Sequence, residues 1–212
     1  PLYHAARAVE LEKPVAVLNL GGVANVTWIG VGAGTVTWID ANGALIAFDT
    51  GPGNALIDDL ARTAIGRPMD EDGRLARAGR PDAARLALWL ADGYFRRAPP
   101  KSLDRDHFAA QLAAARSMSP ADGAATLARF TAEAAGRARV HFPAPPRRWL
   151  VAGGGRRNRD LMAQIAQVLG EDVAPVEAVG WRGDFLEAEA FAFLAVRAVR
   201  GLALSLPTTT GV

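Results

Sequence analysis

The sequence has 212 residues, of which half are hydrophobic, and a formal net charge of only +2. It has no cysteine, which excludes a disulfide framework and a thiolate metal site, and its dispersed charges argue against nucleic acid as a partner. Because no apolar run reaches about 18 residues and no charged-then-apolar leader begins the chain, we expect a soluble, cytoplasmic protein with no membrane partner.

The first part of the chain predicts an antiparallel meander of strands. Apolar residues dominate these segments, and glycine turns separate them. The expected strands cover residues 15–20, 23–30, 35–40 and 44–49. An Asn42-Gly43 pair, which is typical of a two-residue hairpin turn, joins the last two strands.

The middle of the chain, about 54–142, predicts a helical insertion. Apolar residues recur there at helical spacing, and prolines separate the segments. The expected helices cover residues 54–65, 82–95, 104–115 and 119–134. The last of these has a start that resembles a capping box, with Ser119 as the cap and Pro120 at the first helical position.

The final part of the chain returns to strands. The expected elements are a strand over 147–152, a helix over 158–170, a strand over 172–176 and a helix over 184–201. The last helix is so apolar that we expect it to be a core element. Together these elements predict an α/β fold with a mixed sheet, and not a continuous βαβ array.

Three glycine turns stand where predicted strands end. They are Gly21-Gly22, Gly51-Pro52-Gly53 and Gly153-Gly154-Gly155. Glycine lets backbone N–H groups approach a ligand, and a helix N-terminus favours a phosphate. The plainer interpretations are a hairpin turn, a helix cap within 49–54 and a tight turn after a strand. No Rossmann fingerprint or P-loop is present, since the sixth position from Gly153 is Asn158. We favour a nucleotide cleft built mostly from backbone.

Acidic residues gather where the last helix begins. Asp184 and Glu187 are three residues apart, a spacing that places them on one helix face. Together with Glu189 they either complement the helix dipole or face a substrate. The histidines show no spacing typical of a metal site.

Eight segments of the chain, taken in order, resemble one family. They are LNLGGVANVT, FDTGPGNALIDDL, EDGRLARAG, PPKS, ATLARFTAEA, VAGGGRRNRDLM, DFLEAEAFAFLAVR and GLALSLPTTTG. Together they are similar to the C-terminal part of anhydro-N-acetylmuramic acid kinase, a family of the sugar kinase/Hsp70/actin superfamily. The resemblance implies a ribonuclease H-like lobe beside an ATP cleft, with residues 18–27 as the second phosphate loop and 151–158 as the adenosine-side loop.

The resemblance also implies a reaction. ATP, with Mg²⁺, would phosphorylate O6 of 1,6-anhydro-N-acetylmuramic acid while water opens the anhydro ring, giving N-acetylmuramic acid 6-phosphate in peptidoglycan recycling. In this family the first phosphate loop and the catalytic aspartate lie upstream of the position of Pro1. We therefore expect residues 1–212 to form the C-terminal, nucleotide-side lobe, with no catalytic residue and no activity by itself.

The resemblance assigns binding roles residue by residue. The residues expected to bind the nucleotide are Gly21, Gly22, Asn25, Gly51, Gly53, Gly153, Gly154, Gly155 and Asn158. Glu187 and Asp184 are expected to bind the sugar. Two alternatives stay open: a non-catalytic nucleotide-binding or dimerisation lobe, and another sugar kinase or ATPase of the superfamily. The expected partners are ATP and the small sugar, and a homodimer is left open.

Overall fold

The structure is a computed structural model that describes residues 1–31, 45–170 and 172–211. The strands are β1 (Val15–Leu20), β2 (Val23–Ile29), β3 (Leu45–Pro52), β4 (Arg148–Ala152) and β5 (Val173–Pro175). The helices are α1 (Leu2–Arg7), α2 (Ala55–Ile65), α3 (Arg74–Ala78), α4 (Ala83–Leu90), α5 (Ala109–Arg116), α6 (Pro120–Arg137), α7 (Arg159–Leu169), α8 (Leu186–Val199) and α9 (Pro207–Thr210). Short 3₁₀ turns are η1 (Glu71–Gly73), η2 (Gly93–Arg96), η3 (Ala138–His141), η4 (Gly154–Arg157) and η5 (Val176–Val179).

The described strands form one mixed sheet in the order β3-β2-β1-β4-β5. β1, β2 and β3 are antiparallel neighbours, whereas β4 and β5 run parallel to β1. Only β2 therefore runs against the other strands. This order and direction are those of a ribonuclease H-like lobe, so the predicted fold class is confirmed.

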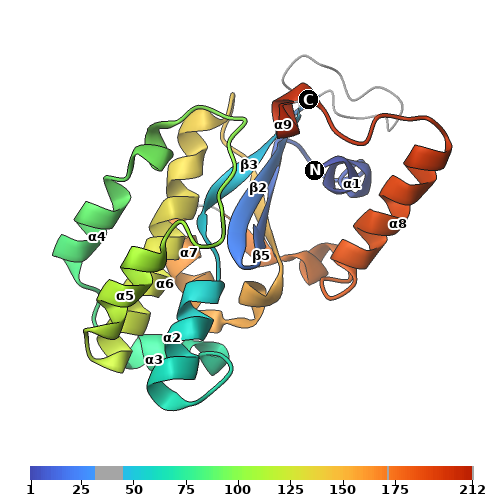
Figure 1. The fold of residues 1–212 in the computed structure, drawn as a ribbon. Coiled ribbons are helices and arrows are strands. Elements are labelled where there is room, and N and C mark those ends of the chain that lie inside the picture. Colours follow the sequence, from blue (N-terminus) through green and yellow to red (C-terminus); the bar gives the residue numbers. More distant parts are fainter. Residues whose placement is uncertain (32–44, 171, 212) are drawn as a thin grey trace.

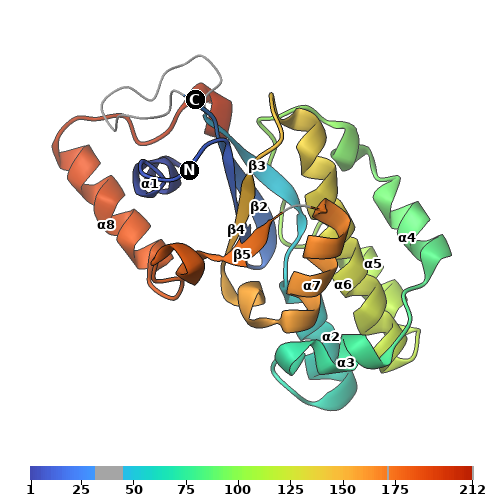
Figure 2. The same ribbon diagram turned by 180° about the vertical axis from the view of Figure 1, so that it is seen from behind.

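Helices cover both faces of the sheet (Figures 1 and 2): α1 and α8 lie on one side, and α2 to α7 lie on the other. Alternate residues of β1 explain this layering. Ala16 and Leu18 join the core beneath the larger helical block, whereas Val15 and Val17 join the core beneath α1. Since side chains alternate across a strand, β1 is buried on both faces and forms the centre of the molecule.

The helical insertion packs around α6, which begins as the sequence predicts. Ser119 caps it by accepting a hydrogen bond from the backbone N–H of Asp122, and Pro120 occupies the first turn. Phe130 on this helix is fully buried, and it meets the rings of Trp89, Phe95 and Phe108. These aromatic contacts tie the insertion into one core.

Several predicted helix limits are wrong for local reasons. The helix expected over 82–95 ends at Leu90, because the Asp92 side chain accepts the N–H of Tyr94 and starts the turn η2. The helix expected over 104–115 begins only at Ala109, after an Asp104 side chain has accepted the N–H of Asp106. Such short side-chain bonds compete with helix formation.

Other elements were not predicted or cannot be compared. The sequence prediction missed the short helices α1, α3 and α9. The strand expected over 35–40 and the Asn42-Gly43 hairpin lie outside the described residues. Within the described part of the chain, no helix has the length and apolar character needed to cross a membrane.

Helix α8 is not the core element that its composition predicts. Leu186 is its only buried residue in the structure, and Phe185, which precedes the helix, is 56% exposed. Figure 1 shows why: α8 lies at the outer edge of the molecule, where it packs beside α1.

Candidate functional site

Two of the predicted glycine turns are joined to one another. The hairpin turn between β1 and β2 accepts two backbone hydrogen bonds from the segment that follows β3. The N–H of Gly53 donates to the carbonyl of Gly22 at 3.1 Å, and the N–H of Asn54 donates to that of Gly21 at 2.7 Å. The two residues that precede α2 therefore fix the position of the hairpin.

The third turn lies at the same edge of the sheet. β1 and β4 are parallel neighbours, so the residues that follow them emerge side by side. Gly155 packs so closely on the end of β1 that an added Cβ would lie 2.7 Å from Cβ of Leu20. Gly153 has φ +78°, a backbone conformation that glycine adopts readily. All three turns thus gather at the carboxyl ends of β1, β3 and β4.

Five of the predicted nucleotide-binding glycines fall into two groups, and Gly21 and Gly153 are half-buried between them. Gly22 and Gly154 are exposed, and an added Cβ on Gly154 would meet nothing within 4 Å. Gly51, Gly53 and Gly155 are buried, and an added Cβ on Gly53 would lie 2.2 Å from the carbonyl oxygen of Gly21. The second group has a packing requirement that explains glycine without a ligand, whereas the first group has none.

Asn158 serves as the N-cap of α7. Its Oδ1 accepts the backbone N–H of Leu161 at 3.0 Å, and the residue is 6% exposed. The side chain thereby fixes where α7 begins, directly after the glycine turn. Its predicted contact with a nucleotide stays a prediction.

A cavity of about 350 Å³ opens beside the third turn. It brings together residues that we expected to bind the nucleotide and residues that we expected to bind the sugar. Its walls include Gly153, Gly154, Asp184 and Glu187. Asn19 at the end of β1 and His4 of α1 also line this cavity. We call it the turn cavity.

Asp184 is engaged by two arginines. Its carboxylate lies 2.6 Å from the guanidinium of Arg156 and 2.5 Å from that of Arg157. The hydrogen bond from Arg156, supported by that from Arg157, holds the pKa of Asp184 below its ordinary value. Arg156 also donates to the carbonyl of Gly153 at 2.9 Å. Asp184 therefore braces the glycine turn, and its predicted contact with a sugar stays a prediction.

Glu187 is placed differently from Asp184. It lies in the first turn of α8, it is exposed, and its side chain lines the turn cavity. Among the residues that the structure describes, none forms a hydrogen bond or an ion pair with its carboxylate. This carboxylate is thus open to a ligand in the cavity.

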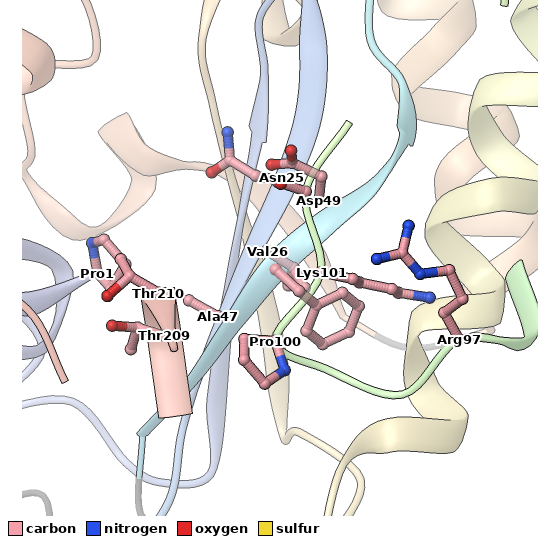
Figure 3. Close-up of a pocket in the computed structure, with 12 residues that line it drawn as sticks. Pro1, Asn25, Val26, Ala47, Asp49, Arg97, Pro100, Lys101, Thr209 and Thr210 are labelled. Atoms are coloured by element: carbon pink, nitrogen blue, oxygen red, sulfur yellow. The ribbon is translucent and has the colours of Figure 1, made fainter. Parts of the chain in front are cut away.

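Three polar side chains cross the sheet in one row. Asn19 of β1 is paired with Asn25 of β2, and Asn25 is paired with Asp49 of β3. Residues directly opposite on neighbouring antiparallel strands lie close together on one face, and Figure 3 shows Asn25 beside Asp49. The Asp49 carboxylate accepts the N–H of Leu103 at 2.8 Å, and burial raises its pKa.

A second cavity, of about 480 Å³, lies over this row (Figure 3). Asn25 and Asp49 line it, together with Arg97, Lys101 and the terminal segments. Lys101 is 8% exposed, and burial, with Arg97 nearby, lowers its pKa. Asn25 therefore belongs to this second cavity, one strand away from the turn cavity.

Sequence reasoning missed His4 as a wall of the turn cavity. Its Nδ1 lies 2.9 Å from Oγ1 of Thr27. Burial, helped by the positive N-terminus, lowers the pKa of His4 to about 3, so the ring is neutral at pH 7. The spacing of Leu2, Ala5 and Ala8 was the available signal for a helix that would carry it.

Metal binding by side chains alone has no candidate in the described part of the chain. No group of three or more His, Cys, Asp or Glu residues is present there that could hold an ion. Mg²⁺ usually binds nucleotide enzymes through one or two carboxylates and the substrate phosphates. Such an ion would be held mainly by the phosphates of the nucleotide, since Glu187 is the residue expected to bind the sugar.

The fold and the site together define a class of protein. A ribonuclease H-like sheet whose glycine turns gather at the carboxyl ends of β1, β3 and β4 is typical of a lobe of the sugar kinase, Hsp70 and actin class. Within this class, the family model described as anhydro-N-acetylmuramic acid kinase matches residues 1–212. The chain belongs to that family.

Curated relatives give the same result. The chain is 58% identical over 211 residues to the anhydro-N-acetylmuramic acid kinase of Rhodospirillum rubrum, and 54% identical over 213 residues to that of Acidiphilium cryptum. The matches cover 100% of this chain but only 53% and 56% of those proteins. The chain thus spans about half the length of the curated relatives it matches.

Two solved structures are also similar to the chain. One is the activator of the 2-hydroxyisocaproyl-CoA dehydratase from Clostridium difficile with bound ADPNP, at a TM-score of 0.49 and 13% identity. The other is component A of the (R)-2-hydroxyglutaryl-CoA dehydratase from Acidaminococcus fermentans, at a TM-score of 0.47 and 17% identity. Each match covers 82% of this chain, and they cover 59% and 60% of those chains.

Proposed function

We propose that residues 1–212 form the C-terminal, nucleotide-side lobe of an ATP-dependent kinase that acts on 1,6-anhydro-N-acetylmuramic acid, with the helical insertion at about 54–142. Family membership and the half-length match support this proposal. The observation that carries it is the turn cavity. There, an exposed glycine turn and the unpaired Glu187 face the same space.

The backbone turns would bind the nucleotide, with the hairpin at Gly21-Gly22 on the phosphate side and the turn at Gly153–Gly155 on the adenosine side. Phosphoryl transfer depends mainly on positioning and on charge stabilisation. Exposed N–H groups near Gly22 can supply both without a side chain, and the exposed turn at Gly154 can approach the adenosine. When Mg²⁺ is bound with ATP, it neutralises part of the phosphate charge. Asn19, between the two turns, can donate from its amide.

The sugar would lie against Glu187. A carboxylate accepts hydrogen bonds from sugar hydroxyl and amide groups, and each such bond to a charged group contributes roughly 1.5–3 kcal/mol. In the proposed reaction, water adds to the anomeric carbon and the anhydro bond to O6 breaks. O6 then takes the γ-phosphoryl group of ATP, giving ADP and N-acetylmuramic acid 6-phosphate. Since the reaction uses ATP and serves peptidoglycan recycling, we place it in the cytoplasm.

The general base is expected outside this chain, on the resemblance described above. Loss of a general base alone lowers rates by about 10²–10⁴-fold. We therefore expect the 212-residue chain by itself to bind ATP weakly and to transfer no phosphate. The isolated chain would then behave as the non-catalytic nucleotide-binding lobe that the sequence left open as an alternative.

A chimeric enzyme tests the proposal. In it, this chain replaces the matching region of the R. rubrum relative, to which it is 58% identical. Phosphate transfer from ATP to 1,6-anhydro-N-acetylmuramic acid is measured for the chimera and for the isolated chain. We expect turnover by the chimera alone. Turnover of similar rate by the isolated chain would contradict the two-lobe proposal, and ATP hydrolysis without sugar phosphorylation would indicate a different ATPase of the class.

A further inference from the structure

His4 lines the turn cavity, but the proposed function does not yet give it a role. It belongs to α1, whose residues Leu2 and Ala5 are each 2% exposed and pack in the core between this helix and the sheet. Its Nδ1 lies 2.9 Å from Oγ1 of Thr27 on β2. Since Nδ1 is occupied by this contact, the nitrogen that His4 offers to a ligand in the cavity is Nε2.

The contact with Thr27 decides which nitrogen of His4 carries the proton. Burial keeps the imidazole neutral at pH 7, and a neutral imidazole has one donor nitrogen and one acceptor nitrogen. Thr27 is 1% exposed, and in the described part of the chain its hydroxyl has no hydrogen-bond partner other than His4. If Nδ1 were the donor, the hydroxyl hydrogen of Thr27 would be buried without an acceptor, at a cost in free energy. Thr27 therefore donates to Nδ1, and Nε2 carries the proton.

The charges around the turn cavity leave one carboxylate free. The guanidinium of Arg156 lies 2.8 Å from Glu177 and 2.6 Å from Asp184, and Arg157 shares the carboxylate of Asp184. Two cations thus face two carboxylates. Glu187 has no such partner among the residues that the structure describes. The cavity therefore repels a further anion and suits an uncharged group that can donate to Glu187.

We propose that the turn cavity binds the acetamido group of the sugar, with Nε2–H of His4 donating to its carbonyl and the carboxylate of Glu187 accepting its N–H. An acetamido group is uncharged and has one donor and one acceptor, which match these two side chains. The lactyl carboxylate of the same sugar fits less well, because it is an anion and would lie beside Glu187. His4 is then a specificity-determining residue, and Thr27 positions its proton.

The proposal rests on the proposed function and adds to it the group of the sugar that the cavity selects. A site built to hydrogen-bond one group of a substrate rejects the analogue that lacks it, because the polar groups of the site are then left unpaired. The sugars 1,6-anhydro-N-acetylglucosamine and 1,6-anhydroglucose differ only at C2, where the first has an acetamido group and the second has a hydroxyl. We expect the chimeric enzyme to bind the first at least about 10-fold more tightly.

Calorimetry with these two sugars and with ATP tests the proposal. His4→Phe keeps a planar ring but removes the donor, so the preference for the acetamido sugar should fall at least about 5-fold while the affinity for ATP stays the same. His107→Phe is the matched control, because His107 is exposed and lies in the helical insertion. The control should keep the full preference.

Thr27→Val is the second variant, in case His4→Phe does not fold. It keeps the shape of the side chain but removes the hydroxyl, so the proton can move to Nδ1 and the acetamido preference should also fall. An unchanged preference in the folded variants overturns the proposal, and so does the absence of binding by both sugars. A loss of ATP affinity without a change in sugar preference overturns it as well, because the cavity would then bind the nucleotide.

These binding measurements need no phosphate transfer. A chimera that prefers the acetamido sugar but transfers no phosphate contradicts the proposed function alone. A chimera that phosphorylates 1,6-anhydro-N-acetylmuramic acid but keeps its acetamido preference in His4→Phe contradicts only the role of His4.

Discussion

The guanidinium of Arg156 lies 2.6 Å from the carboxylate of Asp184, and this contact joins the glycine turn after β4 to the start of α8. Arg156 also binds Glu177 at 2.8 Å and the carbonyl of Gly153 at 2.9 Å. Its side chain is only 6% exposed. One buried cation thus holds together the turn expected to bind the nucleotide and the helix that carries Glu187.

Replacement of this cation should affect both stability and ligand use. We expect Arg156→Gln to lower the free energy of unfolding by about 1–3 kcal/mol, because it removes the charged donor that bonds Glu177, Asp184 and the carbonyl of Gly153. Urea unfolding of the isolated chain measures this change. In the chimera, KM for both ATP and the sugar should rise. Arg157→Gln is the matched control, since Arg157 contacts the same carboxylate but is 68% exposed. Arg157→Gln should lower the free energy of unfolding by less than about 1 kcal/mol. Equal losses of stability in the two variants would contradict the role of Arg156 in holding the turn to α8.

The exposed glycine of the third turn allows a test of nucleotide binding. Gly154→Val adds a β-branched side chain in open space, so the fold should survive while the backbone becomes less accessible to ATP. We expect weaker ATP binding by the chimera in calorimetry, with nearly unchanged Tm. Gly155→Val, which would clash with Leu20, should instead lower Tm strongly. Unchanged ATP affinity in Gly154→Val would show that the turn is only structural.

Glu187 and Glu189 both lie in the first turn of α8, but we expect their replacement to have different effects. Glu187→Gln keeps the shape of the side chain but removes its charge, so the chimera should use the anhydro-sugar less well while ATP binding and Tm stay the same. Glu189→Gln removes a charge bonded to Tyr3 and Arg182, so it should lower Tm with less effect on the sugar. Steady-state kinetics and thermal melting separate these outcomes. Normal sugar kinetics in Glu187→Gln, with a lower Tm, would make Glu187 a structural cap.

Asp58 should make the protein less stable as pH rises. Burial raises its pKa to about 6 from 3.8, despite a hydrogen bond from Asn54. The folded state therefore binds the Asp58 proton more tightly than the unfolded state does. Stability from this group is fully present below pH 3.8 and is lost as pH rises through about 6.

Asp58→Asn should consequently stabilise the chain at neutral pH. One Asp58 oxygen and the Asn54 amide oxygen are buried without a hydrogen-bond partner among the described residues, and an amide at position 58 can donate to Asn54. We expect a gain of about 1 kcal/mol at pH 7, after allowance for partial exposure of the site. The gain should vanish near pH 4. Urea unfolding at both pH values measures it, and an equal gain at both would rule out titration of Asp58 as the cause.

Local pattern was enough to predict much of the fold. β1 and β2 follow from apolar residues around Gly21-Gly22, and the start of α6 follows from Ser119 and Pro120. The ends of α4 and the start of α5 were not predictable in the same way, because single aspartate side chains decide them. The spacing of residue types along the chain does not show which aspartate side chain will accept such a hydrogen bond.

The candidate site depends on contacts that are distant in the sequence. The spacing of Asp184 and Glu187 suggests two equivalent acids on one helix face, but Asp184 precedes α8 and is bound by Arg156, 28 residues away. The row from Asn19 to Asp49 likewise depends on strand register. The exposure of Phe191 was not predictable either, because an apolar helix indicates burial but not against which partner.

The bond between Asn54 and the carbonyl of Gly21 has a consequence for protein design. In a planar trans peptide the carbonyl and the following N–H point in opposite directions. A Gly21 carbonyl that is held toward the start of α2 therefore turns the N–H of Gly22 outward. This part of the hairpin presents a donor to its surroundings, which suits anions and disfavours cations. A graft of this turn onto another scaffold without α2 would free the peptide to rotate, and we expect the grafted loop to lose its preference for anions.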